Sequence, residues 1–385
     1  MPSTAQFSNS GRGRESGRFA AAYRVLEEAV VNRAFPGCVF GVLAGGEVAL
    51  EGALGRFTYD PSSPLVTAET VYDVASITKV VATTAAAMLL VQRGEIDLEM
   101  PLGELLPGFV AGRASGDPAR RVTLRNLLAH NSGLPGYVEL FRDATKPAAL
   151  FEKCLELPLE AEPGARAMYS DPGFILLGKA LEVRMREPLD SWVRREVFGP
   201  LGMDATGFCP APAQRKSIPP TEEDTWFRHR LIQSEVQDEN AWVLGGVAGH
   251  AGLFSNIADL LRFAGAIFNT NAGANAGRNA DRVQDGAHLL FDPDVLKQFT
   301  QLQPPEGSTR ALGWDTPSAN SSAGRHFSAH LVGHLGYSGC SLWIDLDAGV
   351  AIVLLTNRTW PDRKNQMIRE VRPGFHDAIR EALQR

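Results

Sequence analysis

The chain has 385 residues, of which 44% are apolar and 21% charged, as expected for a globular protein of two or three domain-sized units or one large core with an insertion. The 38 basic and 44 acidic residues give a net charge of −6. No basic block interleaved with aromatic residues occurs, so we expect no nucleic-acid partner. No apolar run reaches the roughly 18 residues that a membrane span needs, so we expect no membrane partner either.

The cysteines and the N-terminus bear on cellular location. Cys38, Cys154, Cys209 and Cys340 are far apart and form no C-x-x-C pair, which argues against a zinc knuckle or a disulfide scaffold and is typical of a reducing compartment. Residues 1–17 carry charge but no apolar core, which indicates a disordered tail rather than a secretory signal. We therefore expect a cytoplasmic protein.

The N-terminal part predicts a helix, a β-hairpin and a second helix. Residues 18–34 have helical periodicity, and the apolar segments 38–44 and 47–55 flank the turn residues Gly45-Gly46. A long apolar helix follows from Ser76 to about Arg93, and Gly94 is placed to cap its C-terminus.

The middle third indicates mostly helices and loops. Thr123 can cap a short helix over 124–130, residues 173–185 are helical in pattern, and Asn256 with Asp259 marks the start of another helix. Residues 270–286 are rich in Gly, Ala and Asn, which predicts a mobile loop.

The C-terminal part returns to strands. Two apolar segments flank Asp347-Ala348-Gly349 as a second hairpin, and a helix over 363–384 closes the chain. The order predicts an α+β fold, in which one antiparallel sheet built from both termini is flanked by helices and an all-α domain is inserted. We place the discontinuous sheet domain at 18–95 and 300–385, and the mainly helical domain at 96–299.

Ser76 and Lys79 stand three residues apart in V-A-S-I-T-K-V-V-A. A helix N-terminus favours the negative charge of an attacking alkoxide, and this spacing places the lysine on the same face one turn on. A lysine is a useful base only when it is neutral, and the apolar neighbours of Lys79 indicate the burial that lowers a lysine pKa. The alternative is that Ser76 only caps the N-terminus of the helix, because serine is a preferred N-cap residue.

Two further segments fit nucleophilic catalysis. Tyr169, in Y-S-D, opens another apolar helix and can share a hydrogen-bond network with Ser76 and Lys79, although a tyrosine anchored by packing fits equally well. The glycine-rich stretch G-H-L-G-Y-S-G (333–339) leads into a strand. There the N–H groups of Tyr337 and Ser76 can form an oxyanion hole; the alternative is a bulged edge strand.

S-x-x-K, then Y-S-D, then H-L-G before a C-terminal strand resembles the serine β-lactamase and penicillin-binding-protein superfamily, in particular its class C-like branch with the family VIII carboxylesterases. LLAHNSGLP (127–135) and GHLGYSGCSLWID (333–345) support the resemblance, which covers about residues 20 to 385. It implies that Ser76 is the acylated nucleophile, that Lys79 and Tyr169 act as general base and then acid, and that the active site lies between an α/β domain and an all-α domain.

Two positions depart from the family pattern. The third motif, usually K-T-G, is His334-Leu335-Gly336 here, so the lysine that would hold a substrate carboxylate is a histidine. The second motif often ends in Asn, where Asp171 stands. Both changes favour an uncharged ester over an anionic peptide or lactam. The resemblance places Asp171, His334, Leu335 and Gly336 among the substrate-binding residues, and His250 in G-H-A-G either lines the cleft or has a structural role.

Other constellations have weaker support. His326, His330 and His334 have i, i+4, i+8 spacing, but Val332-Gly333 favours extended backbone and no HExxH glutamate occurs, so we predict no metal. No G-x-S-x-G, Walker loop or dinucleotide fingerprint is present, and we expect no cofactor. The loop aromatics can form an apolar substrate pocket or pack in the core: Tyr137, Trp226, Trp242 and Trp314.

These patterns predict a serine hydrolase that forms an acyl-enzyme, a carboxylesterase on short-chain esters. The alternatives are an amide hydrolase (a β-lactamase, a D-amino-acid peptidase or a DD-peptidase) and, in another class, a catalytically silent binding protein on the same fold. The expected partner is a small-molecule ester or amide, and the sequence leaves the oligomeric state open.

Overall fold

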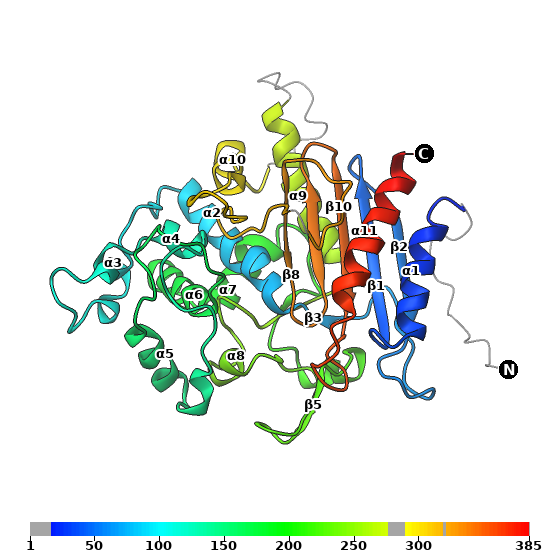
Figure 1. Ribbon diagram of the computed structural model, residues 1–385, viewed down its shortest axis with the longest axis horizontal. Coiled ribbons are helices and arrows are strands. Elements are labelled where there is room, and N and C mark those ends of the chain that lie inside the picture. Colours follow the sequence, from blue (N-terminus) through cyan, green and yellow to red (C-terminus); the bar gives the residue numbers. More distant parts are fainter. Residues whose placement is uncertain (1–16, 276–288, 319–320, 385) are drawn as a thin grey trace.

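The computed structural model describes residues 17–275, 289–318 and 321–384. Its centre is a five-stranded antiparallel sheet in the order β2-β1-β10-β9-β8 (Figure 1). The strands are β1 (Gly37–Ala44), β2 (Glu47–Gly55), β8 (Leu331–Leu335), β9 (Ser341–Asp345) and β10 (Val350–Thr356). Since β1 pairs with β10 from Cys38↔Thr356 to Ala44↔Val350, the two terminal hairpins form one sheet, which confirms the predicted fold class.

Helices cover both faces of this sheet because the side chains of β1 are apolar in both directions. Phe40 packs toward α1 (Ala20–Val31) and α11 (Ile368–Gln384), with its ring 5.2 Å from that of Tyr23 and 5.6 Å from that of Phe375. Figure 1 shows α1 and α11 side by side. On the other face α9 (Ile257–Asn275) packs on β1 and β10, beside Leu43.

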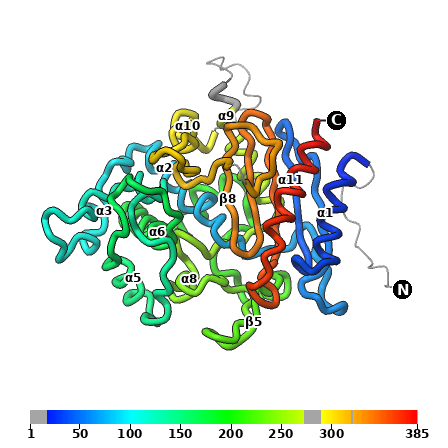
Figure 2. Tube along the Cα trace, in the orientation of Figure 1, coloured from blue at the N-terminus to red at the C-terminus, as the bar shows by residue number. Residues whose placement is uncertain are grey.

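The remaining helices gather at the side of the sheet away from the two chain ends (Figure 2). They surround the buried helical segment that follows Ser76. Their bounds are α3 (Leu102–Leu105), α4 (Leu124–Leu128), α5 (Pro147–Glu156), α6 (Asp171–Met185), α7 (Leu189–Val193), α8 (Glu239–Val243) and α10 (Pro293–Thr300). The domain limits at residues 96 and 299 stay a prediction; α9, within that range, packs on the sheet.

The helical segment after Ser76 contains three kinds of turn. A 3-10 turn (Ala75–Ile77) leads into a π-helical turn (Lys79–Thr84) and then into α2 (Ala85–Gln92), and Gly94 follows with φ +66°. Contrary to the expectation from the sequence, Ala75–Gln92 has the length and apolar composition of a membrane span. Because 83% of it is buried inside the structure, it also fits the core helix of a globular fold.

The sequence patterns did not predict the short strands. Strands β3 (Tyr72–Asp73), β7 (Leu253–Ser255) and β4 (Gly207–Phe208) form a small sheet, and β5 (Glu222–Asp224) pairs with β6 (Arg230–Ile232). Elements of two or three residues are too short to show an alternating pattern.

The mobile loop predicted over 270–286 is wrong for its first residues, since α9 continues to Asn275. Asn271 donates from Nδ2 to Leu346 O at 2.9 Å, a tertiary contact that composition does not reveal. Residues 276–286 of that predicted loop lie outside the described residues.

Candidate active site

Ser76 lies directly after a strained turn that follows β3. Ala75 has a left-handed backbone with φ +49°, which is unfavourable for a residue with a Cβ. Its N–H donates to Asp73 Oδ1 at 2.8 Å, and this buried carboxylate helps hold the turn. Ser76, one residue later, lines a cavity of about 1050 Å³.

Lys79 is completely buried, and all three of its ammonium donors have acceptors. Nζ lies 3.1 Å from Ser76 Oγ, 2.7 Å from Asp171 Oδ1 and 3.0 Å from His250 O. Burial holds the pKa of Lys79 below its ordinary value, while the Asp171 carboxylate opposes this shift. The predicted spacing therefore places an amine of lowered basicity against the candidate nucleophile.

Tyr169 reaches the same hydroxyl from the loop before α6. Its phenol hydrogen-bonds with Ser76, and its ring centroid lies 4.7 Å from Lys79 Nζ. Burial and the nearby Asp171 raise the pKa of Tyr169 well above its ordinary value, so the phenol keeps its proton at neutral pH. The structure thus brings Ser76, Lys79 and Tyr169 together, with the tyrosine protonated in the resting state.

The backbone N–H groups of Ser76 and Tyr337 have no acceptor within the described part of the chain. The turn that carries Tyr337 lies close to the segment before Ser76, because a Cβ on Gly336 would stand 2.4 Å from Val74 O. Ser338 joins the two segments directly, since its Oγ donates to Asp73 O at 2.7 Å. This arrangement fits the predicted pair of oxyanion-hole donors.

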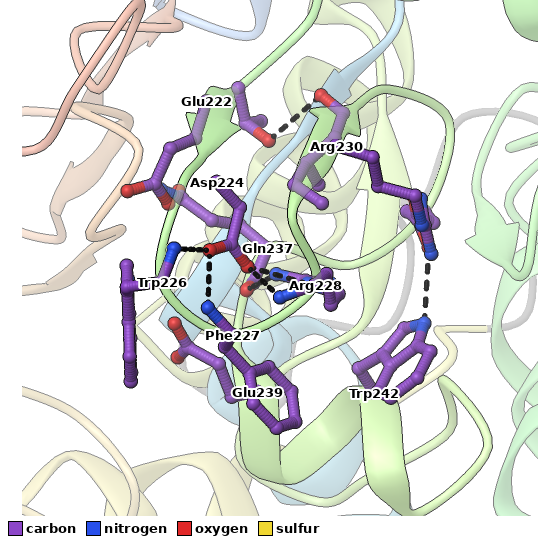
Figure 3. A network of polar contacts seen from close by, with 12 residues as sticks. Glu222, Asp224, Trp226, Phe227, Arg228, Arg230, Gln237, Glu239 and Trp242 are labelled. Atoms are coloured by element: carbon purple, nitrogen blue, oxygen red, sulfur yellow. Dashed lines mark hydrogen bonds and ion pairs between the residues drawn. The ribbon is translucent and has the colours of Figure 1, made fainter.

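Figure 3 shows a polar network around Asp224, Arg228 and Gln237, and this network is hydrogen-bonded to Asp73. The Asp224 carboxylate accepts the N–H groups of residues 226–228 and pairs with Arg228, whose guanidinium donates to Val236 O and Gln237 O. The Gln237 N–H in turn donates to Asp73 Oδ2 at 2.8 Å. The β5–β6 hairpin is therefore connected through hydrogen bonds to the turn that presents Ser76.

Two of the predicted substrate-binding residues, Asp171 and His334, line the cavity and also have protein partners. Asp171 forms the buried ion pair with Lys79, and its side chain is 14% exposed. His334 is 3% exposed; its Nδ1–H donates to Leu335 O at 2.8 Å, which leaves Nε2 as an acceptor without a partner. Burial lowers the pKa of His334 well below its ordinary value, so this residue supplies no cation to a substrate.

His250 acts on the site through its backbone. Its carbonyl accepts from Lys79, whereas its ring is buried, lies outside the cavity lining and bonds from Nε2 to Asp238 Oδ1 at 2.9 Å. Gly249 permits this placement, because a Cβ there would stand 2.2 Å from Phe174 O on helix α6. Of the two roles considered for His250, the structure favours the structural one.

Leu335 and Gly336 line the cavity as predicted, together with an arginine that the sequence patterns did not single out. The Arg310 guanidinium lies 5.3 Å from the Tyr169 ring centroid. Within the described residues it makes no hydrogen bond, and the nearest carboxylate oxygen, Asp315 Oδ1, is 3.5 Å away. No motif marks this residue, since it comes from a loop that only the fold brings to the cleft.

His130 and Asp238 were also missed. His130 Nδ1 accepts the Ser170 N–H at 3.0 Å, and its ring lies 4.7 Å from that of Tyr169, so it helps to position the tyrosine. Asp238, which pairs with His250, lines the cavity. The segment around His130 supported the resemblance to the family, but spacing alone assigned neither residue a role.

The loop aromatics divide between the cavity lining, the core and the exposed surface. Tyr137 lines the cavity, and Trp314 is 1% exposed in the core. Trp226 and Trp242 lie outside the cavity lining and pack around Phe227.

The three histidines considered for a metal have different partners: His326 faces Glu381, His330 bonds to Asp347, and His334 lies buried on β8. No group of three or more metal-ligating side chains occurs within the described residues.

The family model described as Beta-lactamase matches residues 23–372. The chain belongs to the beta-lactamase family. A protein of Salmonella typhimurium named "Putative D-alanyl-D-alanine carboxypeptidase" is 29% identical over 361 residues, which cover 85% of this chain and 80% of the relative. As a member of this family the chain is a hydrolase of the serine β-lactamase and penicillin-binding-protein fold.

Solved structures share the fold of this beta-lactamase family member. EstCE1, described as a hydrolase with promiscuous acyltransferase activity, has a TM-score of 0.73 at 20% identity and covers 94% of this chain and 98% of its own. A penicillin-binding-protein homologue from Caulobacter crescentus has a TM-score of 0.73 at 18% identity, with 97% and 100% covered. At these identities the likeness supports the fold alone.

Proposed function

We propose that this protein is a carboxylesterase that cleaves short-chain esters through an acyl-enzyme on Ser76. The observation that carries the proposal is the geometry at the Ser76 hydroxyl. Lys79 Nζ lies 3.1 Å from Oγ and the Tyr169 phenol bonds to Ser76. The backbone N–H groups of Ser76 and Tyr337, which line the same cavity, have no acceptor among the described residues. A nucleophile, a base of lowered pKa and an oxyanion site together favour acyl transfer.

In acylation, neutral Lys79 accepts the proton of Ser76 as Oγ bonds to the ester carbonyl carbon. The N–H groups of Ser76 and Tyr337 stabilise the oxyanion of the tetrahedral intermediate. When the C–O bond to the alcohol breaks, Tyr169 protonates the leaving oxygen and is reprotonated by Lys79. The alcohol leaves, and the acyl group remains on Oγ.

In deacylation, a water molecule takes the place of the alcohol. Tyr169 and Lys79 remove its proton while its oxygen attacks the acyl carbon, and the same N–H groups hold the second oxyanion. The bond to Oγ breaks, Ser76 regains its proton and the carboxylic acid departs.

Two features favour an uncharged ester as substrate. His334, which stands where the family pattern has a lysine, is buried and neutral and cannot pair with a substrate carboxylate. Asp171, where an amide is usual, is occupied by Lys79 and offers no N–H donor to a substrate carbonyl.

Arg310 favours a second candidate, a peptidase for D-amino-acid peptides that end in a carboxylate. Its guanidinium lines the cavity beside Tyr169 with unused N–H donors, and carboxylates are the partners that this fork prefers. The name of the Salmonella relative agrees with this candidate.

A substrate panel separates the candidates. Wild-type protein and Ser76→Ala are assayed with p-nitrophenyl esters, a chromogenic cephalosporin, D-aminoacyl anilides and an acyl-D-Ala-D-Ala peptide. We expect ester hydrolysis that Ser76→Ala abolishes. Turnover of the peptide or the cephalosporin without ester turnover would instead support the amide hydrolases.

A silent binding protein is tested by chemical labelling. An organophosphonate should add one adduct to wild-type protein, and intact mass should show none on Ser76→Ala. The absence of an adduct on wild-type protein, or an adduct that Ser76→Ala retains, would support the silent alternative.

A further inference from the structure

Arg372, on α11, is a buried cation without an anionic partner. Its side chain is 6% exposed, and no carboxylate oxygen lies within salt-bridge distance among the described residues. Its hydrogen bonds go to three backbone carbonyls, those of Gly336, Gly339 and Cys340, at 2.9 to 3.1 Å. Burying a charge without an opposite charge beside it costs folding free energy, so a functional role for Arg372 would explain its position.

One of these carbonyls belongs to the peptide that carries the candidate oxyanion donor. Arg372 Nη2 donates to Gly336 O at 2.9 Å, and the N–H of the same planar peptide unit is that of Tyr337. A charge-assisted hydrogen bond to a carbonyl draws electron density from the amide and strengthens the N–H as a donor. Because the peptide unit is planar, the bond also fixes the direction of that N–H.

Other contacts make the turn rigid enough for this bond to matter. Gly336 N donates to Cys340 O at 2.8 Å, and Thr356 Oγ1 donates to Ser338 O at 3.0 Å. Ser338 connects the turn to Asp73, as described above. The turn is therefore held between the segment before Ser76 on one side and the Arg372 guanidinium on the other.

We propose that Arg372 is a positioning residue that orients and polarises the Gly336–Tyr337 peptide, so that its N–H stabilises the oxyanion more strongly. The inference rests on the proposed acyl transfer at Ser76. It assigns to Arg372 a fixed charge that acts through the backbone of the Gly336–Tyr337 peptide.

The test isolates charge from shape with two variants. Arg372→Gln keeps an N–H donor but removes the charge, whereas Arg372→Lys keeps the charge but loses the planar set of guanidinium N–H donors. Arg380→Gln is the control on the same helix, because Arg380 is 9% exposed and its partners lie away from the cavity lining. These partners are the His326 carbonyl and the Asp345 carboxylate, the latter at 3.6 Å. Each protein is assayed for ester turnover, rate of organophosphonate labelling and melting temperature.

We expect Arg372→Gln to lower kcat and the labelling rate by about tenfold or more with KM changed less than about twofold, whereas Arg372→Lys retains most of both rates. The infrared carbonyl band of a slowly hydrolysed acyl-enzyme should move to higher frequency in Arg372→Gln, because its oxyanion-hole bonds weaken. Arg380→Gln should match wild type in rate and in carbonyl frequency.

A purely structural role would affect Arg372→Gln and Arg372→Lys alike and leave the carbonyl frequency unchanged. Equal losses in the two variants, or a rate for Arg372→Gln within twofold of Arg380→Gln, would therefore overturn the inference. If Arg372→Gln does not fold, Arg372→Lys decides. A folded Arg372→Lys protein that keeps most of the wild-type rate and carbonyl frequency supports the inference, and one as slow as Ser76→Ala contradicts the inference. Failure of wild-type protein to be labelled at Ser76 would instead contradict the proposed function.

Discussion

Two buried cations lie near the candidate nucleophile or its oxyanion donor, and their surroundings differ. Lys79 has the Asp171 carboxylate at 2.7 Å and the Ser76 hydroxyl at 3.1 Å, whereas the Arg372 guanidinium hydrogen-bonds to backbone carbonyls and has no carboxylate partner within the described residues. Burial lowers both pKa values, that of Arg372 to about 10, so at neutral pH the guanidinium stays charged. The lysine is thus suited to move a proton, and the arginine to hold a constant field.

The difference is that a lysine can lose its proton at an accessible pH and an arginine cannot. A lysine becomes neutral when burial disfavours its charge, and a neutral amine is a base. An arginine keeps its charge under the same conditions and orients dipoles around it. The following experiments change Lys79, its partner Asp171, a third cation of the cleft and the turn that Arg372 contacts, in order of decreasing expected effect.

Replacing Lys79 by Met should remove the base while keeping the volume of the buried side chain. We expect kcat for esters to fall by about 10³-fold or more, in the range that general acid–base catalysis contributes. Lys179→Met is the control and should leave kcat unchanged, because Lys179 lies on α6, is partly exposed and pairs with Glu182 at 2.6 Å. Thermal melting should show that Lys79→Met folds; a collapse in stability would instead mark Lys79 as a structural residue.

Arg310 is a third cation of the cleft, and its guanidinium has no hydrogen bond within the described residues. Replacing it by Gln should raise KM for carboxylate-terminated substrates by about tenfold, as expected for loss of a charge-assisted contact. KM for neutral esters should stay the same. If both substrate classes lose equally, Arg310 acts on the position of Tyr169 and not on the substrate charge.

Asp171→Asn removes the carboxylate that distinguishes Lys79 from Arg372. Because the negative charge of Asp171 raises the pKa of Lys79 against burial, its loss lowers that pKa further. The neutral amine then persists to lower pH, so the acid limb of the kcat/KM profile should move down and relative activity in acidic buffer should rise about threefold or more. A limb that moves to higher pH would contradict the assignment of Lys79 as base.

Ser338→Ala removes the hydrogen bond that ties the Tyr337 turn to Asp73. We expect about 1 kcal/mol less stability, the usual cost of one buried hydrogen bond, and a kcat lowered by about threefold. Ser341→Ala, a buried serine of β9, is the control for stability without an effect on kcat. Equal kcat losses in both variants would show that the turn responds to general loosening of the sheet.

The sequence predicted the sheet because both hairpins have long apolar strands around turn residues. It also predicted the group Ser76, Lys79 and Tyr169, because helical spacing and motif order carry that information. Their meeting at one hydroxyl is consistent with the resemblance to the family.

What the sequence could not show depends on contacts between distant segments. Arg310 and Arg372 stand in no motif, and their roles come from the loops and carbonyls that the fold places beside them. The motif predicted Asp171 as a substrate contact, which stays a prediction; its ion pair with Lys79, at the edge of the cavity, became visible only in the structure. The continuation of α9 past residue 270 depends on a bond to the β9–β10 turn.

The most direct test of acyl transfer is peptide mapping of the adduct formed with an organophosphonate, on wild-type protein and on Lys79→Met. We predict one adduct on the peptide that contains Ser76, formed at least 10²-fold more slowly in Lys79→Met, as expected when a general base is removed. An adduct on another residue, or equal rates in the two proteins, would contradict the proposal that Lys79 activates Ser76.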